Sequence, residues 1–89
     1  MEITKAAQAG ALEARDVLVT VEPNNNRGVQ IELKTKSVIK KQFGKQIDRV
    51  IREKVAELGV ENINIKVEDK GALDYTIIAR VYAAIERAV

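Results

Sequence analysis

The chain has no cysteine and no histidine among its 89 residues. It therefore has no thiol nucleophile and no imidazole base, and the usual zinc ligands are missing. Two tyrosines and one phenylalanine are its only aromatic residues, so base stacking with nucleic acids is poorly supplied. Ser37 is the only serine. These absences disfavour an enzyme, and we expect neither a catalytic residue nor a metal site.

The charge balance is nearly even, with 15 basic and 13 acidic residues. A net charge of +2 does not by itself indicate a nucleic acid or membrane partner. No apolar run approaches the length of about 20 residues that a bilayer requires, and the N-terminus lacks the apolar region of a signal peptide. We expect one small cytoplasmic domain over residues 1–89, with no membrane partner.

Two stretches near the N-terminus alternate between apolar and polar residues, as half-buried strands do. Residues 16–22 place three valines on one face, and residues 29–34 repeat the pattern with Val29, Ile31 and Leu33. Between them, residues 23–28 (Pro-Asn-Asn-Asn-Arg-Gly) are typical of a loop. The pattern predicts an antiparallel hairpin over about 16–35.

From Ser37 the apolar residues recur every three or four positions, which predicts a long amphipathic helix over about 37–58. Thr35 or Ser37 is the expected N-cap, and Gly59 the expected C-terminal stop. The apolar face comprises Ile39, Phe43, Ile47, Val50, Ile51, Val55 and Leu58.

The C-terminal third predicts a third strand from about residue 61, followed by a turn at 69–71. Residues 72–89 fit two interpretations: a helix capped by Asp74, or a strand over about 74–82 followed by a short helix over about 83–88. Because residues 75–82 are rich in β-formers, we favour the second, with a hairpin over about 61–82. The expected fold is α+β, an antiparallel sheet of two hairpins packed against one long helix, with a short C-terminal helix.

Three segments of the chain carry recognisable motifs. They are residues 9–16 (Ala-Gly-Ala-Leu-Glu-Ala-Arg-Asp), 41–44 (Lys-Gln-Phe-Gly) and 69–74 (Asp-Lys-Gly-Ala-Leu-Asp). The chain resembles the acyl carrier subunit, or gamma chain, of citrate lyase, in which the first segment reads Ala-Gly-(Thr/Ser)-Leu-Glu-Ser-x-Asp and the other two have matching blocks. The resemblance covers nearly the whole chain. It departs at Ala14, where the family has serine, and at Tyr75, where cysteine is frequent.

The resemblance implies a non-catalytic carrier. In the family, the serine at the position of Ala14 holds a phosphoribosyl-dephospho-CoA group whose thiol carries acetyl. The implied partners are the alpha subunit (acyl transferase), the beta subunit (acyl lyase) and a prosthetic-group transferase. The related carriers of citramalate lyase and malonate decarboxylase remain alternatives.

Ala14 has no hydroxyl, so this chain cannot be loaded at that position, and we expect no cofactor on it. Either Ala14 is a deliberate Ser-to-Ala form, or it is an ordinary turn residue in a homologue that has lost loading. Asp16 is a candidate for orienting the modifying enzyme or a metal–phosphate, although a local backbone hydrogen bond explains it equally well. Glu13 is a weaker candidate, since a solvated carboxylate is the ordinary outcome.

The predicted long helix and its approach are rich in basic residues, interspersed with acidic ones. A solvated face with ion pairs between successive turns is the default interpretation. Docking of an acidic partner is an alternative. From another class, a small α+β RNA-binding domain would use the same basic helix. The cations are Lys36, Lys40, Lys41, Lys45, Arg49, Arg52 and Lys54.

Overall fold

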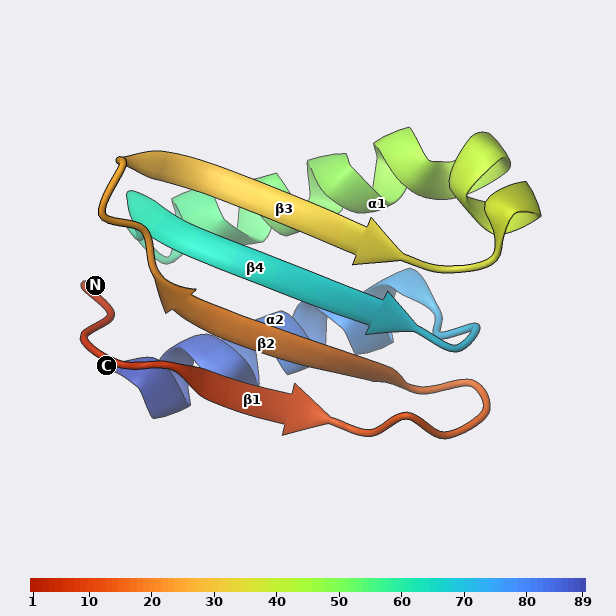
Figure 1. The fold of residues 1–89 in the computed structure, drawn as a ribbon, viewed down its shortest axis with the longest axis horizontal. Helices are drawn as coiled ribbons and strands as arrows, with labels where there is room; N and C mark the ends of the chain where they lie inside the picture. Colours follow the sequence, from red (N-terminus) through yellow and green to blue (C-terminus); the bar gives the residue numbers. More distant parts are fainter.

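The computed structural model describes residues 1–89 and contains four strands and two helices. Both termini lie at one end of the sheet, on the left in Figure 1. No helix is both long and apolar enough to span a bilayer. In chain order the elements are β1 (Ala7–Gly10), β2 (Val17–Pro23), β3 (Gly28–Lys34), α1 (Ser37–Glu57), β4 (Asn62–Asp69) and α2 (Asp74–Ala88).

The four strands form one mixed sheet in the order β1-β2-β4-β3. β2 is antiparallel to β1 and β4, whereas β3 and β4 are parallel. The predicted hairpin over 16–35 is therefore wrong in its pairing, although both strands exist, because β4 lies between them. The connection from β3 through α1 to β4 returns the chain in the same direction, which permits parallel pairing. The α+β class is confirmed.

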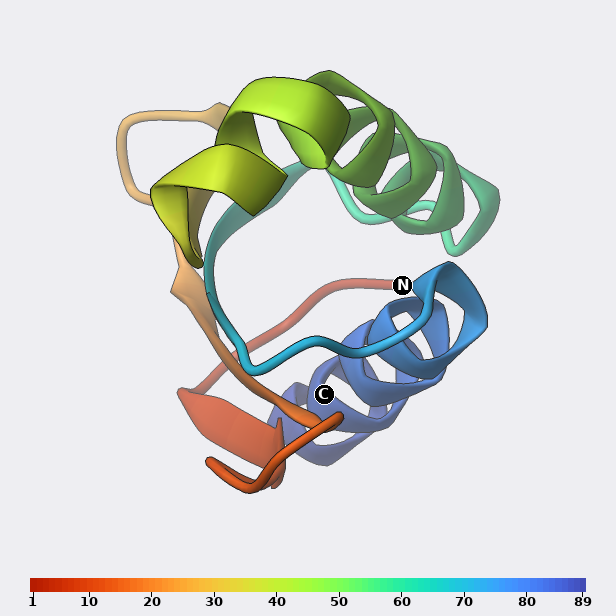
Figure 2. The ribbon, with the colours of Figure 1, turned by 90° about the vertical axis from the view of Figure 1, so that its right-hand side faces the viewer.

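Both helices cover the same face of the sheet (Figure 2). Alternate residues of the two central strands are fully buried there, including Val19 in β2 and Val67 in β4. They pack against α2 residues such as Ile77 and Val81, in one cluster of 17 buried residues. This single apolar core places the loops at the two ends of the sheet, where functional residues are most often found.

The segment predicted as a strand over 74–82 is instead the first part of α2, so the second hairpin and the separate helix over 83–88 are wrong. Asp74 lies in the first turn of α2, where its charge favours the helix dipole. Ile77, Val81 and Ile85 recur every four residues and are fully buried. Packing of this stripe on β1 and β2 outweighs the strand propensity of the local sequence.

The long helix is confirmed as α1, but its predicted apolar face is buried only in part. Ile47, Ile51 and Val55 are buried, whereas Phe43 near its start is 43% exposed. The predicted N-cap, Thr35 or Ser37, is wrong. Lys36 is the N-cap residue, and no side chain makes a capping hydrogen bond. Gly59 ends the helix as predicted, with a positive φ of 71°.

Candidate functional site

Ala14 lies at the tip of the loop that joins β1 to β2. The Asp16 amide donates to the Glu13 carbonyl at 3.0 Å, which closes a tight turn around Ala14 and Arg15. Arg15 has a φ of 65°, the left-handed conformation that this position of a type II turn requires. Ala14 itself is exposed. Residue 14 is thus accessible on a backbone whose neighbouring residues are held by hydrogen bonds.

Gly10 makes the entrance to this loop possible. Its φ is 99°, and a Cβ built there would lie 1.8 Å from the Val17 carbonyl oxygen. The Ala11 amide donates to that same oxygen at 3.1 Å. Only glycine allows this close approach, so the Ala-Gly pair that begins the loop has a structural role in addition to its place in the motif.

Two backbone hydrogen bonds fasten the Ala14 turn to the loop between β4 and α2. The Arg15 amide donates to the Lys70 carbonyl at 2.8 Å, and the Lys70 amide donates to the Asp16 carbonyl at 2.9 Å. These bonds extend the pairing of β2 with β4 beyond the strand ends. The two motif segments 9–16 and 69–74, which are far apart in the sequence, therefore lie side by side.

Asp16 is half-buried and makes the local backbone bond that was one of its two predicted explanations. Its Oδ1 accepts from the Val17 amide at 2.7 Å, and its carboxylate pairs with the Arg80 guanidinium of α2 at 3.1 Å. The hydrogen bond from the Val17 amide has the largest effect, followed by that from the Arg80 guanidinium; both hold the pKa of Asp16 below its ordinary value of 3.8. Asp16 thus anchors the loop to α2. Glu13 is exposed, and only its backbone carbonyl makes a hydrogen bond.

Asp69 links the loop between β3 and α1 to the loop between β4 and α2, which is itself bonded to the Ala14 turn. It is only 6% exposed, and its Oδ1 accepts from the amides of Gly71 and Ala72 at 3.1 and 2.9 Å. Its Oδ2 accepts from the Thr35 hydroxyl at 2.9 Å, just before α1. Asp69 was not among the site residues predicted from the sequence. The Asp-Lys-Gly pattern was the available signal, because an aspartate here bonds the backbone two residues on.

These loops surround a cleft of about 550 Å³ that Ala14 itself lines. Figure 2 looks at this end of the molecule, at which the three loops and the start of α1 lie. The volume lies within the range of small-molecule sites. Three lysines and the half-buried Ile39 contribute to the wall. The lining residues are Ala14, Lys34, Thr35, Lys36, Ile39, Glu68, Asp69, Lys70 and Gly71.

The carboxylates of the cleft already have partners. Asp69 accepts the three hydrogen bonds described above, and Glu68 pairs with Lys66 at 3.5 Å. Lys34 pairs with Glu32 at 3.9 Å, whereas Lys36 and Lys70 form no ion pair. The three lysines outnumber the two carboxylates of the lining, and two of these lysines, Lys36 and Lys70, have no ion-pair partner.

The cations of α1 divide into two groups. Toward the C-terminal end, Arg52 pairs with Asp48 at 2.8 Å, and Arg49 and Lys54 have carboxylate partners at 3.9 and 3.4 Å. This half matches the default expectation of a solvated, ion-paired face. Toward the start of the helix, Lys40, Lys41 and Lys45 form no ion pair, like Lys36. The unpaired charge is concentrated at the end of the molecule that holds Ala14.

Exposed apolar side chains surround the same end. Leu12 in the Ala14 loop is 53% exposed, and Val38 in the first turn of α1 is 63% exposed. Leu73 and Tyr75, where α2 begins, are 60% and 72% exposed. Large apolar side chains gathered around a loop are typical of a surface that contacts another protein.

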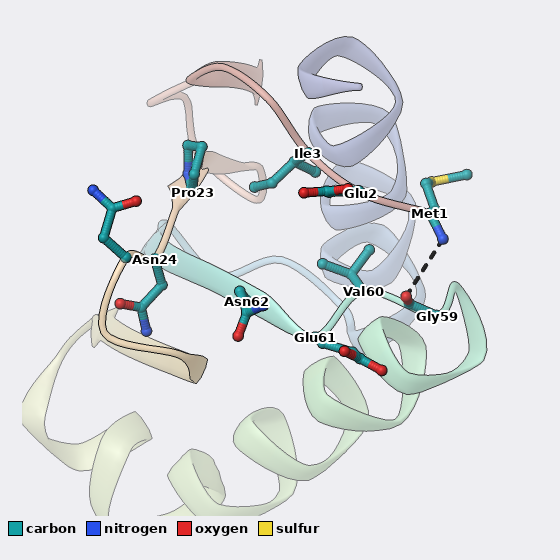
Figure 3. Close-up of a pocket in the computed structure, with 10 residues that line it drawn as sticks. Met1, Glu2, Ile3, Pro23, Asn24, Gly59, Val60, Glu61 and Asn62 are labelled. Carbon is teal, nitrogen blue, oxygen red and sulfur yellow. Dashed lines mark hydrogen bonds between the residues drawn. The ribbon is translucent and has the colours of Figure 1, made fainter.

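A second hollow, of about 460 Å³, lies at the opposite end of the sheet (Figure 3). Its charged side chains are Glu2 and Glu61, and no lysine or arginine lines it. Asn24 is buried there and holds its own loop, donating to the carbonyls of Arg27 and Gly28 at 3.2 and 3.1 Å. This hollow contains none of the site residues predicted from the sequence, and its side-chain charge is opposite to that of the Ala14 cleft.

Comparison with known proteins agrees with the motifs. The family model "ACP: Malonate decarboxylase delta subunit (MdcD)" matches residues 4–88. Citrate lyase acyl carrier proteins from Halothermothrix orenii and Fusobacterium nucleatum are each 48% identical over 88 residues. The match covers 99% of this chain and 90% or 92% of theirs. The Escherichia fergusonii relative is 49% identical, over 99% of this chain and 89% of its own.

Two solved structures share the fold. A chain from a Pseudomonas malonate decarboxylase hetero-tetramer in complex with malonate matches with a TM-score of 0.69 and 15% identity. The match covers 96% of this chain and 84% of that one. A protein from Thermus thermophilus matches with a TM-score of 0.62 and 19% identity, over 98% of this chain and 16% of its own. At such identities these structures support the fold alone.

Proposed function

This chain belongs to the citrate lyase acyl carrier protein family, and from that premise we propose that it is a non-catalytic carrier subunit of citrate lyase whose attachment position is Ala14. The family comprises acyl carrier proteins, which serve multi-subunit enzymes. The proposal for this chain depends chiefly on one observation. Ala14 occupies an exposed turn, next to a cationic cleft, in the segment that carries the family motif.

Ala14 does not fit covalent attachment of the family's phosphoribosyl-dephospho-CoA group. A phosphodiester needs a hydroxyl oxygen from the protein, and a methyl group has none. We infer that this chain has the carrier scaffold but is not loaded at residue 14. Ser37 is exposed but starts α1, outside the Ala14 turn, so it is not a replacement.

The loop suits attachment for a physical reason. A carrier needs an accessible side chain on a backbone that stays in place, so that the attached arm moves and the protein does not. Ala14 is exposed, whereas its neighbours Arg15 and Asp16 are bonded to Lys70 and Arg80. A tether of this kind replaces diffusion by a high effective concentration at each partner's active site.

We propose that the alpha and beta subunits and the prosthetic-group transferase dock at this same end. The exposed Leu12, Val38, Leu73 and Tyr75 supply apolar contact area there. The nearby unpaired lysines would attract an acidic partner surface and speed the encounter. Glu13 and Asp16 flank the attachment position; we propose that Asp16 positions the turn for the transferase and that Glu13 contacts it.

The test is to co-express the Ala14→Ser variant with the family's transferase and to measure its intact mass. We expect the variant to gain the mass of the prosthetic group and the unaltered chain to gain none. The double variant Ala14→Ser with Ser37→Ala should be loaded equally well. An unmodified Ala14→Ser variant, or loading that requires Ser37, would contradict the assignment.

Partner identity needs a separate measurement. When co-expressed with citrate lyase alpha and beta subunits, the unaltered chain should co-purify with both, because docking does not require the missing hydroxyl. Leu73→Asp should weaken this association, while Val89→Asp, at the far end of α2, should not. Co-purification with malonate decarboxylase subunits but not with those of citrate lyase would reassign the partner system.

A further inference from the structure

The cleft beside Ala14 differs from the rest of the surface in combining a hollow with unpaired positive charge. We propose that Lys34, Lys36 and Lys70 bind the phosphate groups of a nucleotide non-covalently in this cleft. One step rests on the proposed function: the nucleotide is identified with the phosphate-bearing part of a carrier's prosthetic group. The binding site itself is argued from the side chains that line the cleft.

The three lysines come from two segments that the fold brings together, residues 34–36 and the loop that contains Lys70. Lys34 ends β3, Lys36 immediately precedes α1, and Lys70 lies between β4 and α2. Their loops are fixed to one another by the buried Asp69, which bonds to Thr35 on one side and to Gly71 on the other. The cationic groups are therefore held around one cleft at little cost in backbone entropy on binding.

The charge of the cleft favours an anion. Lysines outnumber carboxylates in its lining, Glu68 is paired with Lys66, and Lys36 and Lys70 have no carboxylate partner. An ammonium group binds phosphate as a point charge that donates hydrogen bonds. Ile39 adds apolar surface to the wall, which suits a ligand with an organic part in addition to its phosphates.

Ala14 lines this same cleft, so a group attached at residue 14 starts at its edge. A tethered group reaches an effective concentration in the millimolar range. A cleft that binds free nucleotide with a Kd of about 1 mM would therefore hold the tethered nucleotide about half of the time. Such weak binding keeps the arm docked between encounters and still lets partner subunits withdraw it.

The unaltered protein is suited to the test, because its residue 14 carries no hydroxyl for attachment and the ligand can be added free. We would titrate the 15N-labelled chain with ADP and follow the backbone amide shifts at an ionic strength of about 0.1 M, where charges more than about 10 Å apart are largely screened. We expect saturable shifts concentrated at residues 14, 34–39 and 68–71. Adenosine, which has the same base and sugar without phosphates, should bind at least about tenfold more weakly.

Matched lysine variants then locate the site. Lys36→Gln and Lys70→Gln should each weaken ADP binding about tenfold, as expected for the loss of one charged hydrogen bond. Lys45→Gln removes the same charge from an exposed position on α1 outside the cleft and should change the Kd by less than about twofold. The amide spectra of all three variants in the absence of ligand report whether each remains folded.

Three results would overturn the inference. They are no saturable binding of ADP, adenosine binding as strong as that of ADP, or equal weakening by Lys45→Gln and the cleft variants. The last result would mean that the long helix attracts anions without a defined site, as in the RNA-binding alternative. Loading of Ala14→Ser is an independent measurement. Loading without ADP binding would reject only the cleft, and ADP binding without loading would reject only the carrier assignment.

Discussion

At each end of the sheet one buried polar side chain holds a loop in place. Asp69, at the end that carries Ala14, is 6% exposed, and Asn24, at the opposite end, is 5% exposed. The Asn24 side chain makes three hydrogen bonds, all with nearby backbone groups. The Asp69 carboxylate also accepts three, two from backbone amides and one from the Thr35 hydroxyl. Each end also has one non-glycine residue with a φ of 65°, Arg15 or Arg27.

The two ends differ in the side chains that take no part in holding the loops. At the Ala14 end, three lysines and several exposed apolar side chains surround a cleft. At the opposite end, the hollow is lined by asparagines and two glutamates, and the two chain termini lie close by (Figures 1 and 3). Similar loop architecture therefore does not identify a functional site. The comparison points to the end where Lys36 and Lys70 have no ion-pair partner and several large apolar side chains are exposed.

The largest expected difference between the ends concerns two glycines. Gly10→Ala places a methyl group against the Val17 carbonyl oxygen and forces alanine into a positive φ, so we expect a loss of about 4 kcal/mol in stability. Gly28→Ala, with a φ of 93° and open space around it, should cost only about 1 to 2 kcal/mol. Urea unfolding of both variants checks this. Equal losses would mean that the β1–β2 loop relaxes without cost.

The two buried polar side chains should also differ. Asp69→Ala leaves two amides and a hydroxyl without their acceptor, and we expect it to cost about 3 kcal/mol. Asn24→Ala should cost about 2 kcal/mol, since its side chain bonds only within its own loop. Urea unfolding again measures both losses, and a larger loss for Asn24→Ala would reverse the ranking.

The isosteric control is Asp69→Asn. Its carbonyl oxygen retains the bonds from Gly71 and Ala72, and its amide can donate to the Thr35 hydroxyl. We expect a cost of about 1 kcal/mol, measured in the same urea experiment. A loss as large as that of Asp69→Ala would show that the negative charge, and not the hydrogen-bond geometry, holds this end together.

Asp16, at the Ala14 end, should make a smaller contribution to stability that depends on pH. The Val17 amide and Arg80 lower the pKa of Asp16, so the folded state binds this proton less readily than the unfolded state does. The stabilisation is therefore complete above the ordinary pKa of 3.8 and is lost as the pH falls through the lower folded value. Asp16→Asn should be less stable than the unaltered protein near neutral pH, and the difference should shrink in acid.

Thermal unfolding at a series of pH values measures this difference. Glu2→Gln is the matched control at the opposite end, where the exposed carboxylate makes no hydrogen bond or ion pair. Near neutral pH it should be destabilised less than Asp16→Asn. A stability difference for Asp16→Asn that stays constant down to about pH 2 would contradict the assigned role of the carboxylate.

The smallest expected effect is at the attachment position itself. Ala14→Ser adds a hydroxyl to an exposed turn residue, and we expect the free energy of unfolding to change by less than about 0.5 kcal/mol. Asn25→Ser, in the exposed loop at the opposite end, is the comparison. A marked loss at residue 14 alone would mean that the methyl group packs against the cleft wall and that a modified side chain would disturb the turn.

Much of the fold could be predicted from local patterns. Alternation located the strands that begin at Val17 and Gly28, and the three-to-four-residue period located α1 and its end at Gly59. β1 was missed because four residues of alanine, glutamine and glycine carry no strand signal. The start of α2 was misassigned because its β-branched residues fit a strand locally, whereas their burial every four residues suits a helix.

The candidate site was predictable in part. The motif identified Ala14, Glu13 and Asp16, and the structure places all three in one turn. Arg80 was not identified, because its partner Asp16 is 64 residues away and leaves no periodic trace in the sequence. The Asp-Lys-Gly pattern predicted the local turn at Asp69 but not its bond to Thr35, 34 residues away. The cleft was missed for the same reason, since its lysines come from separate segments.

The sequence by itself determined the family, the α+β class and the identity of residue 14, because these depend on residue order and local periodicity. The tertiary structure alone decided that β4 lies between β2 and β3, that residues 74–88 form a helix, and that Lys34, Lys36 and Lys70 line one cleft with Ala14. Alternation shows which side chains of a strand share a face but not which strand is its neighbour. That choice is made when the apolar faces of all the elements are buried together, and here it also assembled the cleft.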